Sequence, residues 1–389
     1  MPTERLYYRD ATLLTFSAQV TARDDGGRRI YLDRTAFYPT SGGQPFDTGL
    51  LGGIRVEDVV DEEDRIAHLL AAPLESPQVE GQVDAGRRRD HMEQHTGQHL
   101  LSAVVEDLFR APTASVHFGP ESSSIDLSIA SLTADQARRA ERRANDLIRE
   151  NRPVVVSFED AATVQGLRKP TGRTGEIRVI TIEGVDRSAC GGTHVSATGQ
   201  IGALLVRKVE RAKGMVRMEF LCGGRTVERA RSDYEVLAGL AAARSAAMGE
   251  LPALLEKERS EFKSLQSARR ELEERVAGYR AAELYANTKP RADGVRWLHE
   301  QVAEGGAEAL RALAQAVTGM EKAVLVGNSV QPAALVIASS ADSGVDAGQL
   351  LKKGIADVGG RGGGSPRVAQ GSAPDQAALA GLVARLLAD

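Results

Sequence analysis

The sequence predicts a mixed α+β protein built from several folded units, and three observations lead to this fold class. The chain has 389 residues, against about 150 for a typical domain, so two or three units are expected. Short apolar or alternating runs dominate the first 85 residues, a helical period dominates residues 225–287, and strands alternate with helices after Pro290. The expected order is a small N-terminal β domain, an α+β domain, a helical spacer and a small C-terminal α/β domain.

The composition is that of an ordinary globular protein. Hydrophobic residues make up 42% of the chain and charged residues 26%, with a net charge of -4, which excludes intrinsic disorder. The longest apolar stretches, such as residues 333–338, are far shorter than the roughly 18 residues of a membrane span. The N-terminus, residues 1–10, lacks the apolar core of a signal peptide. We therefore expect a cytoplasmic protein with no membrane partner.

Residues 1–85 are expected to form the β domain. Short apolar or alternating runs lie at residues 13–16, 29–32, 53–60 and 66–70, and Gly, Asp and Pro separate them. This punctuation is typical of short strands joined by turns.

Residues 86–222 are expected to form the α+β domain. Apolar residues at helical spacing predict a helix over residues 88–109, and Thr133 is a suitable N-cap for a second helix that ends near Arg149. Strands are predicted at residues 123–129, 154–158 and 177–182.

Residues 225–288 are expected to form the helical spacer. Alternating steps of four and three residues define four heptads, and two of the nine seam positions are charged, which favours a long helix packed in a hairpin over a strong two-stranded coiled coil. The seam positions are Leu251, Leu255, Glu258, Phe262, Leu265, Arg269, Leu272, Val276 and Tyr279.

Residues 290–389 are expected to form the C-terminal α/β domain. Apolar strands are predicted at residues 323–326 and 334–338, and amphipathic helices at residues 306–317, 347–355 and 373–387. The only low-complexity tract of the sequence is Gly-rich, at residues 359–364.

Two short motifs carry metal-ligating side chains. His95 and His99 are one helical turn apart and can present two imidazole nitrogens to one ion. Cys190 and His194 are separated by Gly-Gly-Thr, and the two glycines allow the tight turn that brings thiolate and imidazole together. Nitrogen and sulfur ligands with a single thiol favour Zn²⁺ over calcium, magnesium or an iron–sulfur cluster.

Three alternatives apply to this site. An isolated histidine pair at this spacing is more often a solvated helix face, and His91 is a rival ligand on nearly the same face. Thr96, rather than glutamate, follows His95, which disfavours a zinc protease. Four protein ligands suggest a closed, structural coordination sphere, whereas a catalytic zinc keeps an open position. The sequence leaves the choice between structural and catalytic zinc open.

These motifs resemble a known family. Residues 95–101 (HTGQHLL) and 190–194 (CGGTH) are similar to the editing domain of alanyl-tRNA synthetases and of the free-standing alanyl-tRNA editing proteins called AlaX. Residues 37–45 (FYPTSGGQP) resemble the glycine-rich motif of that family's N-terminal β-barrel, and residues 359–366 (GGRGGGSP) resemble the glycine-rich motif of the synthetase's C-terminal domain. The long AlaX form is therefore the expected architecture.

The resemblance implies an activity. It predicts an ATP-independent hydrolase that acts in trans on mischarged tRNA(Ala), removing serine or glycine, because a pocket made for alanine cannot strongly reject amino acids of similar size. The family's metal ligands correspond to His95, His99, Cys190 and His194, all present here. The implied cofactor is Zn²⁺, and the implied partner is tRNA(Ala) carrying serine or glycine, with a homodimer as a further expectation.

The resemblance also suggests the polar groups of the active site. Gln98 stands where many members have threonine, and His117 stands where some have glutamine, so both are predicted catalytic residues. The expected role of His117 is proton transfer, the alternative being a buried structural histidine. Gly42, Gly43 and Gln44 are predicted to contact the substrate, although this loop can equally be a plain barrel turn.

Two basic segments are predicted to contact RNA, because a chain of net charge -4 needs local basic patches. The first contains Arg207 and Lys208 within residues 207–217, and the second contains Arg361 in the glycine-rich stretch. A solvated strand and a tight turn are the corresponding structural alternatives. Two other classes of function remain open, namely a zinc-containing tRNA-binding accessory protein without catalysis and a zinc hydrolase of small esters or amides.

Overall fold

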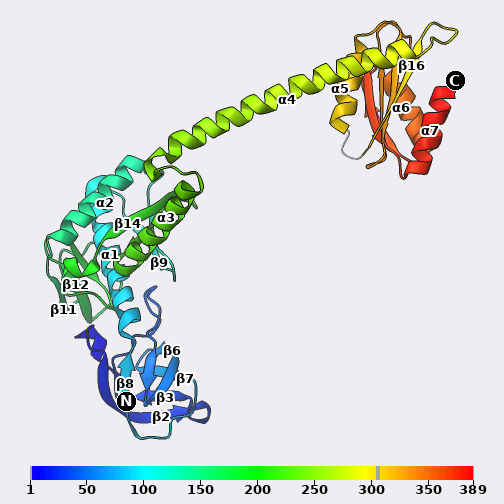
Figure 1. Ribbon diagram of the computed structural model, residues 1–389. Coiled ribbons are helices and arrows are strands. Elements are labelled where there is room, and N and C mark those ends of the chain that lie inside the picture. The colour runs from blue at the N-terminus through cyan, green and yellow to red at the C-terminus, as the bar shows by residue number, and fades with distance from the viewer. Residues whose placement is uncertain (1, 304–306, 389) are drawn as a thin grey trace. The chain divides into compact units, whose positions relative to one another are not determined.

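The computed structural model describes residues 2–303 and 307–388. The chain forms two compact units, Met1–Ala243 and Arg244–Asp389, and both contain helices and strands (Figure 1). The mixed α+β class predicted from the sequence is confirmed. In the described part of the chain, no helix combines the length and the apolar character that crossing a membrane requires.

Six antiparallel strands of the first unit pair in a closed order. The order is β2-β3-β7-β6-β5-β8, in which β2 pairs with both β3 and β8. Alternate residues of β8 are buried, as expected for strands with one face on a core. The strand predicted at residues 13–16 begins later and extends further. The six strands are Thr15–Asp24 (β2), Arg29–Leu32 (β3), Gly49–Leu51 (β5), Ile54–Glu62 (β6), Arg65–Leu70 (β7) and Gln78–Val83 (β8).

His68 is buried in this sheet as a neutral imidazole. Its Nδ1 lies 3.2 Å from the Ile30 carbonyl oxygen and its Nε2 lies 2.8 Å from the Thr35 hydroxyl. Burial lowers the pKa of His68 from 6.5 to about 4, and the hydrogen bond to Ile30 opposes this shift only in part. Between these two values the unfolded chain binds more protons than the folded chain.

We therefore expect the contribution of neutral His68 to the free energy of unfolding to be fully present above pH 6.5. The free energy of unfolding should fall by up to about 3 kcal/mol as the pH drops towards 4. Urea unfolding of the metal-free protein across this range measures the loss. The matched variant His68→Gln, which does not titrate, should show a shallower slope. Equal slopes for the two proteins would contradict the assignment.

The second part of the first unit is built on helix α1 (Ala85–Phe109). Asp84 caps it, since the Asp84 carboxylate accepts a hydrogen bond from the Arg87 amide. Two sheets accompany α1. One has the order β14-β15-β10-β9, with strands Leu204–Ala212, Met215–Cys222, Ser123–Leu127 and Thr113–Phe118. The other has the order β11-β12-β13, with strands Val154–Asp160, Glu176–Ile182 and Asp186–Ala189.

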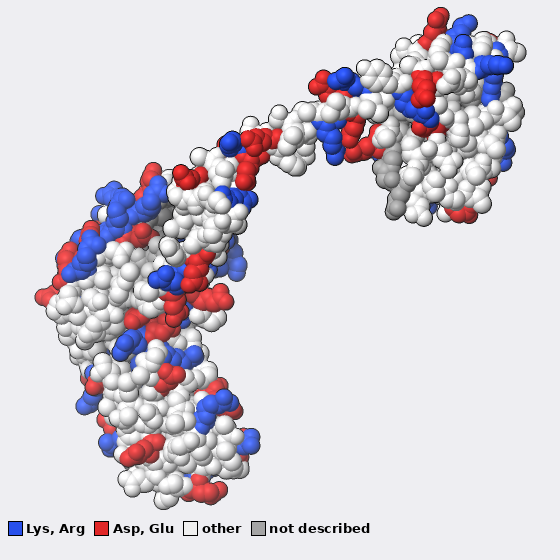
Figure 2. Space-filling model, viewed as in Figure 1, with Lys and Arg blue, Asp and Glu red and all other residues white. Residues whose placement is uncertain are grey.

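Helix α2 (Ala134–Arg149) begins at the predicted cap. The Thr133 hydroxyl accepts from the Gln136 amide, and the Gln136 side chain accepts from the Thr133 amide, which forms a capping box. Small residues of α2 are buried towards the core, and arginines cover its outer face, where Figure 2 shows a concentration of basic side chains.

The helical segment expected over residues 225–288 consists of two helices with a break between them. Helix α3 (Gly223–Ala243) ends in the first unit, and α4 (Leu251–Asn287) starts in the second, after a short 3-10 turn at Met248–Glu250. Pro252 stands in the first turn of α4, where a missing amide hydrogen costs nothing, and it marks a new helix start.

The predicted packing of the heptad seam is also corrected. Within its unit, α4 packs through its last turns, where Ala277 and Ala281 join a core with α5 (Ala307–Thr318). Most of the predicted apolar seam is exposed, at Leu255, Phe262, Leu265, Leu272, Val276 and Tyr279.

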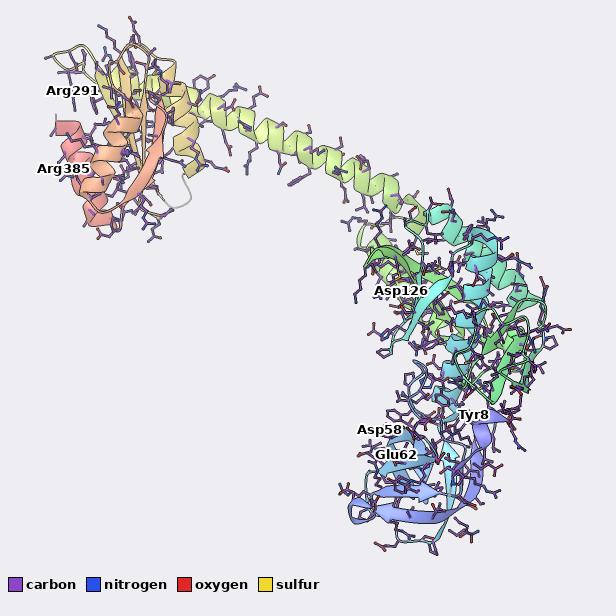
Figure 3. All side chains as sticks on the ribbon, turned by 180° about the vertical axis from the view of Figure 1, so that it is seen from behind. Tyr8, Asp58, Glu62, Asp126, Arg291 and Arg385 are labelled. Atoms are coloured by element: carbon purple, nitrogen blue, oxygen red, sulfur yellow. The ribbon has the colours of Figure 1, made fainter. Side chains whose placement is uncertain are left out.

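The rest of the second unit is a five-stranded sheet with three helices. Its order is β16-β17-β18-β20-β19. Arg291 ties the segment after α4 to the C-terminal helix, since its guanidinium donates to the Leu387 carbonyl at 2.7 Å (Figure 3). The low-complexity tract ends in the edge strand β19, and the start of the helix predicted at residue 306 lies outside the described residues. The elements are β16 (Arg296–Val302), β17 (Ala323–Ser329), β18 (Ala334–Ser339), α6 (Ala347–Asp357), β19 (Arg361–Gly364), β20 (Val368–Ser372) and α7 (Gln376–Ala388).

Candidate metal centre

Helix α1 presents two histidines from a buried stretch. His95 and His99 are one turn apart and both are buried. Between them, Gly97 lets the helix approach β15 closely, because a Cβ at this position would lie 2.2 Å from the Cys222 sulfur. A larger residue would push the helix, and both imidazoles with it, away from its present position.

The chain leaves β13 through the turn that carries Cys190 and His194. The buried guanidinium of Arg178 holds this turn, donating to the carbonyl oxygens of Cys190 and Gly192 at 2.8 Å each. Gly192 passes so close to His95 that a Cβ there would lie 2.1 Å from the ring. The glycine is therefore required by the close approach of the turn to α1.

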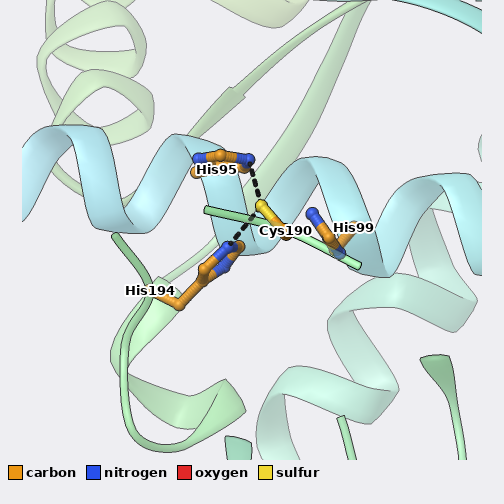
Figure 4. Close-up of side chains that lie close together, drawn as sticks. All are labelled: His95, His99, Cys190 and His194. Atoms are coloured by element: carbon orange, nitrogen blue, oxygen red, sulfur yellow. Dashed lines mark hydrogen bonds between the residues drawn. The ribbon is translucent and has the colours of Figure 1, made fainter. Parts of the chain in front are cut away.

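The two motifs meet at one point. One nitrogen from each of His95, His99 and His194 and the Cys190 sulfur all lie within 4.8 Å of one another (Figure 4). The sulfur is 3.4 Å from His95 Nε2 and 3.3 Å from His194 Nε2. In a tetrahedral zinc site, sulfur and nitrogen ligands lie about 3.5 Å apart. The two sulfur–nitrogen distances match this spacing, and the four side chains are the types that could hold a zinc ion.

Each imidazole is fixed by a partner on its other nitrogen. His95 Nδ1 lies 2.8 Å from Gln44 Oε1, His99 Nδ1 lies 2.9 Å from Asp186 Oδ2, and His194 Nδ1 lies 3.2 Å from Thr96 Oγ1. In the neutral imidazoles, Nδ1–H donation to these oxygens leaves the lone pair of each Nε2 available to bind a cation. Such outer partners orient metal ligands and raise their basicity.

Charges around the cluster favour a thiolate. Burial raises the pKa of Cys190, but the adjacent imidazoles of His95 and His194 bring it well below its ordinary value. Burial lowers the pKa of His194 to about 3. Burial also opposes the charge on His99, yet the hydrogen bond to Asp186 raises the pKa of His99 to about 9. The cluster thus combines a thiolate with an acidic outer partner, a donor set suited to a cation.

A cavity of about 470 Å³ opens beside three of the four ligands, His95, His99 and Cys190. One wall comes from the first sheet and its flanking loops and includes Tyr8, which is labelled in Figure 3. A basic loop, residues 168–173, also lines the cavity. The metal centre is therefore placed on the wall of a chamber large enough for a small polar ligand.

The predicted catalytic residues have different positions. Gln98 is buried and lines the cavity, and its amide nitrogen donates to the Ser102 hydroxyl at 2.8 Å. His117 is exposed and is not part of the cavity wall. Its neighbour Val116 lines the cavity, and successive residues of strand β9 face opposite sides. The structure does not bring His117 to the site.

The loop predicted to contact the substrate, residues 42–44, has a structural role at one of its positions. Gly42 lines the cavity, and Gly43 packs at the ring of Phe118. Gln44 is buried and joins the two motifs of the cluster, because its Oε1 also accepts from the Thr193 amide at 3.0 Å. Gln44 thus positions His95.

The remaining predicted residues are not members of the four-residue cluster. Arg207 is paired with Asp233 at 2.6 Å, and Lys208 with Glu210 at 2.6 Å. Arg361 is exposed on β19 in the second unit. The rival ligand His91 is buried near Asp47 and does not join the four-residue cluster.

The sequence reasoning missed the outer partners. Asp186 is the most important, since it joins His99 to Arg168, whose Nε donates to Asp186 Oδ1 at 2.6 Å. A signal was present, because residues 186, 188 and 190 share one face of an extended segment that leads into the cysteine motif. Thr96 lies within the histidine motif itself.

The comparisons with known proteins agree with this site. Residues 177–219, which include the cysteine motif, match the family described as the threonyl and alanyl tRNA synthetase second additional domain. The alanine–tRNA ligase of Methanoregula boonei is 30% identical over 393 residues, and that of Halorubrum lacusprofundi is 33% identical over 395 residues. These alignments cover 96% and 97% of this chain and 42% of each ligase.

A crystal structure of the C-Ala domain from Aquifex aeolicus alanyl-tRNA synthetase is 23% identical, with 26% of this chain and 91% of that domain covered. Its TM-score of 0.23 is too low to support a conclusion about the fold. The chain spans less than half the length of the curated relatives it matches. Over nearly its whole length, this chain is homologous to alanyl-tRNA synthetases, and its residues 177–219 match the second additional domain of threonyl and alanyl tRNA synthetases.

Proposed function

We propose that this protein is a cytoplasmic trans-editing hydrolase that removes serine or glycine from mischarged tRNA(Ala). The observation that carries the proposal is the metal centre on the wall of the 470 Å³ cavity, in a chain homologous to alanyl-tRNA synthetases. The cavity has room for an aminoacyl group and the terminal ribose, and its polar wall suits an aminoacyl ester.

Zinc is the cofactor that the four side chains would hold, with His95, His99, Cys190 and His194 as ligands. When bound, it would supply Lewis-acid polarisation of the ester carbonyl or of water. The three histidine ligands are positioned by Gln44, Thr96 and Asp186, so the protein orients these imidazoles before substrate arrives.

Gln98 is the side chain best placed to orient the aminoacyl group. Ser102 engages its amide nitrogen, which leaves the amide oxygen to accept a hydrogen bond from the substrate's ammonium group or hydroxyl. Water adds to the ester carbonyl, and the bond to the 3′ oxygen of the tRNA breaks. The tRNA leaves with a free hydroxyl, and the amino acid leaves as a carboxylate.

The C-terminal unit is proposed to bind the body of the tRNA or to dimerise, as the sequence suggested. Arg361 on the exposed edge strand β19 is the residue proposed to contact RNA there. The homodimer stays a prediction.

The test is deacylation of Ser-tRNA(Ala), Gly-tRNA(Ala) and Ala-tRNA(Ala) by the full chain with its zinc content measured. Selective release of serine or glycine supports the proposal. The competing function, a tRNA-binding accessory protein with structural zinc, follows from the four protein ligands, which can close the coordination sphere. It predicts tRNA binding and stoichiometric zinc without deacylation.

A further inference from the structure

The outer face of α2 carries more positive charge than its neighbouring carboxylates neutralise. Its five arginines are all exposed, and three of them pair with acidic residues at the helix ends. Among the described residues, Arg139 and Arg142 have no ion-pair partner. Glu141, which lies between them in sequence, is turned inward and accepts from the Val206 amide at 2.7 Å. Two adjacent cations are therefore available on this face.

Contacts connect this face to the cavity. The Arg139 guanidinium lies 6.0 Å from the centre of the Phe109 ring at the end of α1, and Arg110 follows Phe109 in an exposed position. One turn earlier on α1, Glu106 lies 3.8 Å from Arg168, which lines the cavity.

The next basic residues reach the cavity itself. Lys169 donates to the Thr113 carbonyl oxygen, and both Lys169 and Arg173 line the cavity. In the described chain, neither of these side chains forms an ion pair. We call Arg142, Arg139, Arg110, Lys169 and Arg173 the basic track, since contacts lead from α2 past the end of α1 to the cavity.

We infer that the basic track binds the phosphate backbone of the acceptor arm of tRNA and leads its 3′ end into the cavity. The inference rests on the proposed function, because an aminoacyl ester enters the cavity only together with its RNA strand. Arginine and lysine neutralise phosphates without reading sequence, so the track supplies affinity and register, and the cavity supplies selection.

The alternative surface is the one predicted from the sequence, residues 207–217. There Arg207, Lys208 and Arg217 are held in ion pairs, which leaves Arg211 and Lys213. These two residues provide a matched control, because they are exposed in the same unit and their reversal changes the net charge equally.

The experiment measures binding of an acceptor-arm RNA hairpin that ends in CCA and carries no amino acid. The hairpin is bound to the zinc-loaded full chain over a series of salt concentrations. The double variant Arg139→Glu/Arg142→Glu should bind about tenfold or more weakly, and the slope of log K against log salt should shrink by about 2. The control Arg211→Glu/Lys213→Glu should keep the wild-type slope. Arg139→Lys/Arg142→Lys should retain most of the affinity, because it keeps the charge.

The inference is overturned if the track variant and the control variant bind the RNA hairpin with equal affinity. An acidic protein would then be the expected partner of the α2 face. Its failure is separable from that of the proposed function. If the track variant loses RNA but wild type deacylates none of the three charged tRNAs, the proposed function fails and the track stands. If wild type deacylates Ser-tRNA(Ala) and the track variant does so equally well, the track fails alone.

Discussion

His99→Ala is expected to release the metal and to lower deacylation of mischarged tRNA(Ala) by at least about 100-fold. Loss of an outer partner alone typically costs about 10- to 100-fold in metal affinity or activity, so loss of a ligand should cost more. His99 is the ligand fixed by Asp186, and its removal leaves that buried carboxylate without its imidazole partner. Zinc per chain and single-turnover deacylation are the two measurements.

Asp186→Asn is the graded companion of this variant. It keeps the shape of the side chain and removes its charge, so zinc affinity should fall by about 10- to 100-fold while a saturating amount of zinc restores activity. Far-UV circular dichroism of the metal-free proteins controls for folding. Full zinc occupancy and wild-type activity in His99→Ala would contradict the assignment of the metal centre.

Arg88→Met is expected to destabilise the first unit by about 3–5 kcal/mol, because it leaves the carboxylate of Asp47 buried without its partner. The two side chains are 1% and 0% exposed, and they approach to 2.5 Å. Arg88 also donates to the carbonyl oxygens of Ala11 and Ala36, so it fastens the start of α1 to the first sheet.

Urea unfolding measures this effect. The matched control is Arg89→Met, an exposed neighbour on the same helix, whose change should stay within about 0.5 kcal/mol. A difference of less than about 1 kcal/mol between the two variants would contradict the anchoring role of Arg88. Because α1 carries both histidines, Arg88→Met should also weaken zinc binding.

Local signals made part of this fold predictable. The helix ending at Arg149 starts at Thr133 as expected, because a capping box and a helical period agree over a short range. The strands at residues 323–326 and 334–338 are present as β17 and β18, since buried apolar runs bounded by turns are strong signals. The break between α3 and α4 was missed because residues on both sides of it are helical, although the heptad seam begins only at Leu251, the first residue of α4.

The four residues of the cluster could be predicted from the sequence, but the side chains that hold the histidines in place could not. The spacing within each motif predicted that its two ligands lie close together. Because all four ligands suit the same ion, Zn²⁺, the two pairs were predicted to form one site. The partners Gln44 and Asp186 are 51 and 87 residues from the histidines they hold, and the one local signal is the face that Asp186 shares with Cys190. Val116, rather than His117, lines the cavity. Strand β9 was not predicted, and the alternation of that strand decides which neighbour faces the cavity.

The most direct test of the editing proposal is single-turnover deacylation of Ser-tRNA(Ala), Gly-tRNA(Ala) and Ala-tRNA(Ala) by the zinc-loaded full chain, beside His99→Ala. The account predicts release of serine or glycine by wild type, little hydrolysis of the correctly charged tRNA, and loss of activity in the variant. Stoichiometric zinc with no deacylation of any of the three substrates would contradict it and would indicate a tRNA-binding protein with a structural zinc site.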